Sequence, residues 1–513
     1  MKKYIPFLIA LLLTLPSLMA QKPDAQYKLI RKTYKVNTDG SMEYNFRKEI
    51  TLLRNRAITA YADKGETFIV YNPEFQNLTI NESYTQRADG SRVKTPHNAF
   101  IEQLPKQCEN CGRLNNLIEL AIVHTALEYD CTIVLDYTIT SKSNLIQEEI
   151  VMTDDCPIEK YEIIVDLPKN QTLHHHLAGE YYAVIWGARF RTLTDAHTFH
   201  LVGSSIPQSS ADPYLPTHQF YPTLYLSNAQ PEPSTISLSK DKLPEAQTMI
   251  VSIRKEAQQL YAKDHSNSIE DYVARHLQSY VIDNIHLNDI PQTMLANRTA
   301  TPLEIWQSGC ATPLEKAILL AALLRQAGMY AYVNLGQKDI PLEDGTSFPL
   351  NDQSLISVNV TIDGQQTTLS AIHKDAPKGQ TTPRHKTIEW TPTDNSEYAT
   401  LQIPNDNPLG IDASLLTPNR KAPVQTTTVN DTITYDIHLT ADAKLVKTPP
   451  TISYSIDGIG SISVMVKQYD ANITIEKTMT ITTDIIDDEH YADFRKMMID
   501  WQQPQLLYLK RVK

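Results

Sequence analysis

The chain has 513 residues, of which 41% are apolar, 21% charged and 8% aromatic, so it can bury several hydrophobic cores and form about three domains of ordinary size. Its formal net charge is −12. Because an acidic surface repels phosphate backbones, this charge argues against nucleic acid as a partner.

Residues 1–20 predict a secretory signal. Lys2 and Lys3 precede an apolar run from Tyr4 to Leu18, and Ala20 supplies a small residue at a plausible cleavage point. Removing both lysines with the signal changes the net charge from −12 to −14. Since no later stretch reaches the roughly 20 apolar residues of a membrane-spanning helix, we expect an exported protein. It would be soluble after cleavage, in the periplasm or associated with the cell envelope.

Residues 21–240 predict a large antiparallel β-sandwich. Apolar and polar residues alternate in runs such as Met42–Phe46 and Cys131–Tyr137, and turn signals such as Thr38-Asp-Gly40 separate the runs. Prolines and serines become frequent between Phe220 and Pro244, which indicates a linker at the end of this region.

Residues 245–390 predict an α+β core with three helices and a small sheet. The first helix is expected from Ala246 to Ala262, and Ser268 caps the second. For the third helix, Thr312 is the N-cap, Pro313 takes the first position, Glu315 completes a capping box and Gly328 marks the end.

Residues 391–513 predict a C-terminal β domain, so the fold class is α+β with several domains. A loose stretch from Asp375 to Thr393, rich in Lys, Pro and Thr, leads into it. The domain is expected to end with a short amphipathic helix from Tyr491 to Trp501 and a strand from Leu506 to Val512.

The chain has five cysteines, Cys108, Cys111, Cys131, Cys156 and Cys310. The first four lie in the N-terminal region, where an oxidising compartment favours disulfides among them in any of three connectivities. A redox or zinc role for Cys108-Glu-Asn-Cys111 lacks both a second CxxC and a thioredoxin-like context. We therefore expect these four to pair and Cys310 to be left over.

Cys310 directly precedes the third helix of the core. The positive end of a helix dipole favours thiolate over thiol, so this position suits a nucleophile that has a base beside it. The alternative is that Cys310 packs as a small buried hydrophobe.

The segment from Ala274 to about Ala371 resembles the core of the transglutaminase-like superfamily, a papain-related fold. The resemblance rests on the helix Ala274–Ile285 and on Gly309-Cys310 followed by Leu320–Tyr332. The preceding region, notably Tyr71–Ile80 and Ala88–Val93, is similar to a domain of unknown function found before such cores in exported Gram-negative proteins. Those relatives carry a third, C-terminal β domain.

The resemblance implies a Cys-His-Asp relay, but two of its members are replaced here. The strand expected to begin with the histidine is Leu350–Ile356 and supplies Gln353 and Ser354, and Ser370 stands in place of the aspartate. No histidine occurs between Leu287 and Ile372. The resemblance therefore implies the fold with a degenerate triad.

Other candidates remain open. His373 or His286 could serve as a substitute base, and Trp306 could line a cleft beside Cys310 or anchor its loop to the core. The run His174-His175-His176 alternates between two strand faces, so at most two of these side chains could share a metal ion. We expect no metal and no cofactor.

Three functions follow from these observations. The first is a binding or scaffolding module for a peptide or glycan-peptide, without turnover, in a possible envelope complex. The second is an active cysteine peptidase or amidase, a thiol hydrolase or acyltransferase that uses Cys310 with a non-standard base. It predicts an imidazole within about 4 Å of the sulfur. In the third, the large β domain does the binding and the core is a spacer.

Overall fold

The computed structural model describes residues 23–511 except for 65–66, 179–188, 194–197, 210–213, 216–220, 230–234, 237–242, 264–267, 297, 337–347, 349, 351–354, 374–383, 391–396, 405–406, 419, 421, 441–442 and 470–471. The predicted signal at residues 1–20 lies outside this part.

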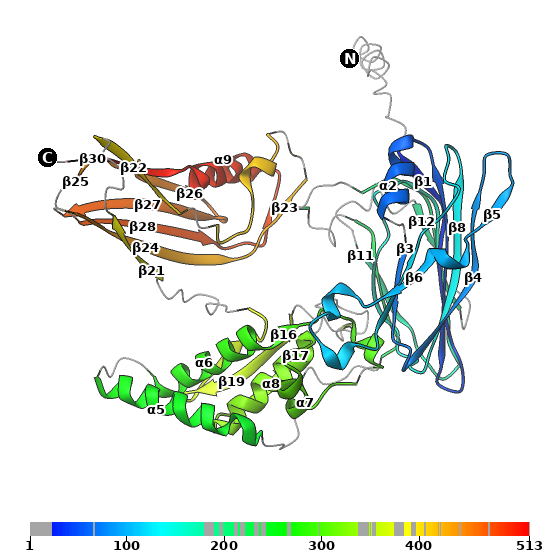
Figure 1. The fold of residues 1–513 in the computed structure, drawn as a ribbon, viewed down its shortest axis with the longest axis horizontal. Coiled ribbons are helices and arrows are strands. Elements are labelled where there is room, and N and C mark those ends of the chain that lie inside the picture. Colours follow the sequence, from blue (N-terminus) through cyan, green and yellow to red (C-terminus); the bar gives the residue numbers. More distant parts are fainter. Residues whose placement is uncertain are drawn as a thin grey trace, which may run out of the picture.

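Buried apolar residues gather in three large clusters. One runs from Ala25 to Leu226, one from Leu243 to Ala371 and one from Ile403 to Leu509. Figure 1 shows the corresponding parts as a blue to cyan sheet region, a green to yellow helical region and an orange to red sheet region. We refer to them as the N-terminal, central and C-terminal regions.

An eight-stranded sheet forms the body of the N-terminal region. In spatial order it contains β12 (Phe190–Thr192), β13 (Thr198–Ile206), β10 (Ile158–Asp166), β1 (Ala25–Val36), β2 (Met42–Leu52), β8 (Thr132–Ser141), β4 (Gln76–Gln86) and β5 (Arg92–Lys94). One pair departs from the expected antiparallel arrangement, because β1 and β10 run parallel. A parallel pair requires a long crossover, and here the chain between Val36 and Ile158 supplies it.

Two three-stranded sheets complete the N-terminal region. One has the order β11 (His174–Ala178), β14 (Thr223–Ser227) and β9 (Gln147–Val151), and the other β3 (Thr67–Tyr71), β7 (Ile118–Ile122) and β6 (Phe100–Gln103). The region also contains an unexpected helix, α2 (Asn55–Lys64). Short 3-10 helices occur at η1 (His97–Ala99), η2 (Lys106–Cys108) and η3 (Gly112–Leu114).

The central region places helices against a four-stranded sheet. The helices are α5 (Gln247–Lys263), α6 (Ile269–Asn284), α7 (Pro302–Ser308) and α8 (Pro313–Gln326), with 3-10 turns at η6 (Pro244–Ala246) and η7 (Gln292–Leu295). The sheet order is β15 (Thr235–Ile236), β18 (Ala331–Asn334), β19 (Ser357–Ile362) and β20 (Gln365–Leu369). The three predicted helices are confirmed.

The caps of the central helices are those that the sequence indicates. The Ser268 side chain accepts a hydrogen bond from the Asp271 amide at the start of α6. Thr312 and Glu315 form a reciprocal capping box at α8, and Gly328 has a φ of 90° just beyond its end. Glycine adopts this left-handed conformation without steric penalty, which is why the helix ends there.

The C-terminal region contains a five-stranded sheet covered by one helix (Figure 1). Its order is β21 (Arg384–Trp390), β24 (Val429–Leu439), β28 (Asn472–Ile481), β27 (Gly460–Tyr469) and β26 (Ile452–Ile456). Smaller elements are the sheet of β22 (Tyr398–Ile403), β30 (Gln505–Arg511) and β25 (Ala443–Lys447), the pair β23 (Val424–Gln425) and β29 (Ile485–Ile486), and η9 (Ala413–Leu415). The predicted last helix and strand are confirmed as α9 (Tyr491–Gln502) and β30.

Two stretches expected to be loose contain strands. The predicted linker after Phe220 includes β14, and β15 within it pairs with β18 of the central sheet. The stretch from Asp375 to Thr393 includes β21, which pairs in parallel with β24. Prolines and polar residues identified these segments as irregular, but β15 and β21 are edge strands, which tolerate such sequences when a neighbouring strand supplies hydrogen bonds. No helix in the described part is long and apolar enough to cross a membrane.

Candidate functional site around Cys310

The backbone on either side of Cys310 is tightly determined. Helix α7 ends at Gly309, whose φ of 66° reverses the chain direction, and the next two residues form the short strand β17 (Cys310–Ala311). The Ser308 hydroxyl donates to the carbonyl oxygen of Cys310 at 3.2 Å. The glycine is required because residues with a Cβ rarely adopt this conformation, so the Ser-Gly-Cys sequence fixes where Cys310 lies.

Strand β17 pairs in parallel with β16 (His286–Leu287), so that His286 lies beside Cys310 in the register. The His286 amide donates to the Gly309 carbonyl at 2.7 Å and the Asn288 amide to the Ala311 carbonyl at 2.9 Å. His286 is exposed whereas Cys310 is completely buried. The two residues are thus neighbours across the strand pair but differ in solvent access.

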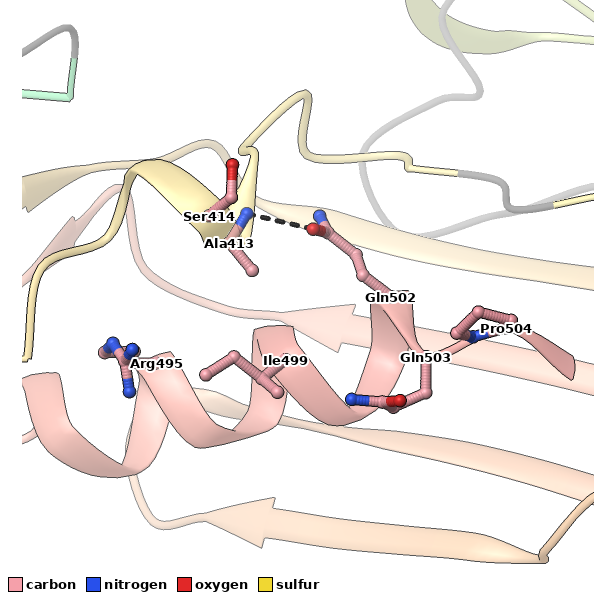
Figure 2. A pocket seen from close by; sticks show the side chains of 7 residues that line it. All are labelled: Ala413, Ser414, Arg495, Ile499, Gln502, Gln503 and Pro504. Atoms are coloured by element: carbon pink, nitrogen blue, oxygen red, sulfur yellow. Dashed lines mark hydrogen bonds between the residues drawn. The ribbon is translucent and has the colours of Figure 1, made fainter.

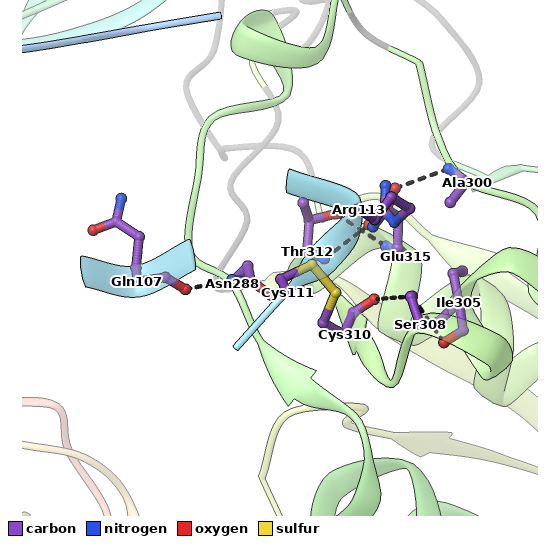
Figure 3. The surroundings of a disulfide bond; sticks show 10 residues. All are labelled: Gln107, Cys111, Arg113, Asn288, Ala300, Ile305, Ser308, Cys310, Thr312 and Glu315. Carbon is purple, nitrogen blue, oxygen red and sulfur yellow. Dashed lines mark hydrogen bonds and ion pairs between the residues drawn. A yellow bond between two sulfur atoms is a disulfide. The ribbon is translucent and has the colours of Figure 1, made fainter. Parts of the chain in front are cut away.

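The sulfur of Cys310 is bonded to the sulfur of Cys111 across 199 residues of sequence, with the two Cα atoms 5.6 Å apart. Figure 3 shows this disulfide joining a segment of the N-terminal region to the strand before α8. The expectation that the four N-terminal cysteines pair and leave Cys310 free is therefore wrong. Cys108, Cys131 and Cys156 are buried free thiols instead. Compartment and counting indicated that pairing would occur, but they contain no information about which Cα atoms the fold brings together.

A small apolar cluster surrounds the disulfide. It combines four residues of the N-terminal region with three of the central region: Cys108, Cys111, Leu114, Leu117, Ile290, Leu295 and Cys310. Cys108 lies in the short helix η2 and Leu114 in η3, and in Figure 1 this segment reaches from the N-terminal sheets to the green helices near β16 and β17. We call the segment 104–117 the covering loop, because it buries the sulfur of Cys310.

A buried ion pair fixes the covering loop beside α8. Glu315 is completely buried, and its carboxylate accepts hydrogen bonds from the Arg113 guanidinium at 2.5 Å, the Thr312 amide at 3.0 Å and the Ala300 amide at 2.8 Å. Figure 3 shows these groups converging on one carboxylate. The local sequence indicates only the capping role of Glu315. Its second partner, Arg113, comes from another region of the chain and gives no local signal.

Two amides add further polar contacts between the regions. The Asn288 side chain donates to the carbonyl oxygen of Gln107 in the covering loop. The Asn72 side chain donates to the carbonyl oxygen of Met294 at 3.0 Å. Asn72 and Asn288 are both buried. Because buried amides need partners, these bonds specify how the N-terminal and central regions are seated against each other.

In the described part of the chain, no hydrogen bond joins either alternative base, His286 or His373, to the Cys310 sulfur. His373 uses its backbone amide to donate to the Ser370 hydroxyl at 3.0 Å, and its carbonyl lies 3.5 Å from the Gln278 side-chain nitrogen. Among the described residues, neither His286 nor His373 forms a hydrogen bond through its ring, and no imidazole bonds to the Cys310 sulfur. Ser370 closes a local turn, because its hydroxyl accepts hydrogen bonds from the Ile372 and His373 amides.

Trp306 acts as a packing residue of α7. Its ring stacks on Tyr280 of α6 with centroids 5.0 Å apart, and it lies half-buried against the central cluster. These contacts place Trp306 in the packing between α6 and α7. Gln353 and Ser354, at the expected histidine strand, lie outside the described residues.

The three histidines of β11 have different aromatic neighbours, as expected when successive strand residues point to opposite faces. His174 and His176 contact Phe348 and Tyr225 respectively, and His175 contacts Phe199. Within the described residues, His, Cys, Asp and Glu side chains do not assemble in threes as a metal site would need.

Lys316, next to Glu315, points toward the end of α6. It is 2% exposed, and its ammonium donates to the Ile285 carbonyl at 2.7 Å and more weakly to that of Ile282 at 3.4 Å, at the end of α6. Burial disfavours the charged form and lowers the pKa of Lys316 to about 8, although Asp283 acts in the opposite direction.

A shallow depression of about 290 Å³ lies elsewhere, in the C-terminal region. Figure 2 shows it between η9 and the end of α9, lined by Ala413, Ser414, Arg495, Ile499, Gln502, Gln503 and Pro504. Gln502 accepts a hydrogen bond from the Ala413 amide at 2.9 Å, and Arg495 donates to the Leu416 carbonyl at 2.8 Å. These side chains hold η9 against α9. The residues that line the depression are all different from those around Cys310.

Two family models match parts of the chain, and both describe domains of unknown function for which a structure has been solved. Residues 38–184 match DUF3857, and residues 403–506 match DUF3858. The central region, which contains Cys310, lies between the two matches. No curated protein matches the sequence significantly.

One solved structure matches almost the whole chain. It is named as a "putative protease" from Parabacteroides distasonis, is 24% identical, and has a TM-score of 0.71 over 95% of this chain and 99% of that one. This similarity shows a shared fold. An M1 zinc metallopeptidase from Deinococcus radiodurans also matches, at 9% identity over 45% of this chain and 52% of that one, but its TM-score of 0.19 carries no structural argument.

Proposed function

We propose that this is an exported, transglutaminase-like protein that binds a peptide or glycan-peptide without turning it over and acts as a scaffold in the cell envelope. In this proposal residues 21–240, 245–390 and 391–513 are separate domains. The central domain contributes the papain-related fold and the two β domains contribute surface.

The observation that carries the proposal is the bond between Cys310 and Cys111. A sulfur in a disulfide is neither thiol nor thiolate, so it cannot attack an amide carbonyl. The sequence adds that no histidine lies between Leu287 and Ile372, where the family's base is expected. A thiol nucleophile also needs a base, since near pKa 8.5 it is only a few per cent ionised at neutral pH.

The fold similarity supports a second candidate, a cysteine peptidase or amidase that becomes active after reduction. Its nucleophile would be Cys310, released from Cys111, and its base would be a histidine brought in by movement of the covering loop. The supporting observation is the near-complete match to a structure named as a protease.

One experiment separates the two candidates. The mature protein, oxidised or treated with a phosphine reductant, is incubated with a fluorogenic peptide library and with peptidoglycan fragments, with Cys310→Ala as the control. We expect retention of the protein on immobilised peptidoglycan fragments or on a member of the library, without cleavage in either redox state. Cleavage by the reduced protein that disappears in Cys310→Ala would overturn the proposal and establish the second candidate.

A further inference from the structure

The cysteine next to the disulfide has no role in the proposed function. Cys108 is a free thiol, fully buried, and belongs to the same apolar cluster as Cys111 and Cys310. It lies three residues before Cys111 in the sequence Cys108-Glu-Asn-Cys111. Three sulfur atoms are thus gathered in one small core, although a single disulfide uses only two of them.

The backbone brings Cys108 and Cys111 within the range of a disulfide. The Cys111 amide donates to the Cys108 carbonyl at 3.0 Å, which closes a four-residue turn. A turn of this kind places its first and last Cα atoms less than about 7 Å apart, and disulfides span Cα separations of roughly 4.4–6.8 Å. An alternative bond between Cys108 and Cys111 therefore requires no change in chain topology.

We propose that Cys108 is the resolving thiol of a built-in exchange, which transfers the disulfide from Cys111–Cys310 to Cys108–Cys111 and thereby releases the covering loop from Cys310. The reaction is balanced without any external oxidant or reductant. Cys108 loses its proton, and its thiolate attacks the sulfur of Cys111 and forms the new bond. Cys310 leaves with the electron pair of the old bond and takes up a proton.

The exchange changes how the covering loop is attached to the central region. Before it, the covering loop is attached to the central region by a covalent bond, by the Arg113 pair with Glu315, and by the Asn288 bond to Gln107. After it, only the non-covalent contacts remain, so the loop can separate and expose the thiol of Cys310. The exchange is independent of the proposed binding function, because it uses only the three sulfurs.

The surroundings of Cys108 make the exchange slow at neutral pH. Burial raises the pKa of the Cys108 thiol, so little of it is ionised while the loop is closed. Since only the thiolate attacks, the rate should increase about tenfold for each pH unit below that pKa. Opening of the loop or a rise in pH would therefore start the transfer.

Proteolytic mapping reads out the position of the disulfide directly. Cleavage after Lys106 and Arg113 gives one peptide, residues 107–113, that contains both Cys108 and Cys111, whereas cleavage after Arg298 and Lys316 gives a peptide with Cys310. The first peptide is either cross-linked to the second or closed by an internal disulfide. Mass spectrometry distinguishes these two forms in a single digest.

The test uses the mature full-length protein, oxidised and free of reductant, incubated with N-ethylmaleimide at pH 7 and pH 8 and then quenched with acid. We expect the internally bonded 107–113 peptide and alkylated Cys310 to appear together, roughly tenfold faster at pH 8. In Cys108→Ser, Cys310 should remain cross-linked and unlabelled. Cys131→Ser, which alters another buried free cysteine, should behave as the unmodified protein.

Two outcomes would overturn the proposal. One is labelling of Cys310 at the same rate in Cys108→Ser, and the other is the absence of the internally bonded peptide from the unmodified protein at pH 8. If Cys108→Ser fails to fold, as judged by its near-ultraviolet circular dichroism, Cys108→Ala serves instead because alanine suits an apolar site. The peptide from the unmodified protein decides the question even without a variant, and neither readout depends on ligand binding or peptide cleavage.

Discussion

The N-terminal region contacts the other two regions through junctions of different chemistry. Its junction with the central region contains a disulfide, a completely buried carboxylate paired with Arg113, and two buried amides. Its junction with the C-terminal region is centred on Tyr214. The Tyr214 hydroxyl accepts from the Asp412 amide at 2.7 Å, and its carbonyl accepts from the Gln425 amide and from Arg420.

This difference indicates where the molecule requires a fixed geometry. Breaking one partner of a buried charged pair is far more costly than losing a hydrogen bond at a partly exposed site. The first junction therefore holds the covering loop over Cys310 rigidly, whereas the hydrogen bonds described at the second converge on one half-buried tyrosine, Tyr214. Variants at the two junctions and on α8 test this contrast.

Glu315→Ala should have the largest effect. It removes the capping partner of Thr312 and leaves the guanidinium of Arg113 partly buried without its carboxylate, so we expect a loss of about 3–5 kcal/mol in the free energy of unfolding. Chemical denaturation monitored by fluorescence measures it. Glu304→Ala is the matched control, because Glu304 has the same capping-box role in α7 but is exposed. It should cost about 1 kcal/mol, and equal losses would contradict the contrast.

Cys310→Ser should have the next largest effect, because it removes the link between the regions. A disulfide that closes a loop of this length stabilises by roughly 2–5 kcal/mol. The melting temperature should decrease, and a phosphine reductant should lower it in the unmodified protein but not in the variant. Cys131→Ser corrects for burying a hydroxyl group. A reductant effect that persists in Cys310→Ser would show that another disulfide stabilises the protein.

Lys316 tests whether burial of its ammonium group in α8 makes the stability of the protein depend on pH. Its pKa of about 8 in the folded protein lies below the ordinary lysine value of 10.5, so the unfolded chain binds the additional proton between these values. The contribution of Lys316 to stability should therefore be least favourable below pH 8 and increase toward pH 10.5, by about 1–3 kcal/mol.

The measurement for Lys316 is the difference in unfolding free energy between the unmodified protein and Lys316→Met at pH 7, 8, 9 and 10. This difference should shift in favour of the unmodified protein as the pH rises. Lys255→Met, at an exposed position of α5, should give a difference that does not change with pH. A flat profile for Lys316→Met would show that the ammonium is better solvated than its burial indicates.

Tyr214→Phe should have the smallest effect of the series. It removes one hydroxyl that accepts from the Asp412 amide, and a hydrogen bond of this kind contributes about 1 kcal/mol. Hydrogen exchange at the amides of η9, which follows Asp412, should accelerate while α8 remains protected. Tyr469→Phe, at a tyrosine that is 69% exposed, provides the control. A loss comparable to that of Glu315→Ala would mean that the second junction is as rigid as the first.

Much of the central region was predictable because its signals are local. Ser268 with α6, and Thr312, Pro313 and Glu315 with α8, are bonds between residues three or four positions apart, which a sequence pattern can show. The position of Cys310 after Gly309 follows for the same reason, since the left-handed glycine ends α7 within the same short segment. The predicted C-terminal helix and strand belong to this class too.

The surroundings of Cys310 were not predictable, because they are made by a distant part of the chain. Nothing near Cys111 or Arg113 indicates that they meet Cys310 and Glu315, and the parallel pairing of β1 with β10 has no local signal either. Such contacts depend on how whole sheets and helices pack, and that depends on the sum of many weak interactions. The helix, its cap and the place of the cysteine follow from local sequence signals. That the cysteine is bonded, buried and covered follows from long-range packing, because its partners lie about 200 residues away.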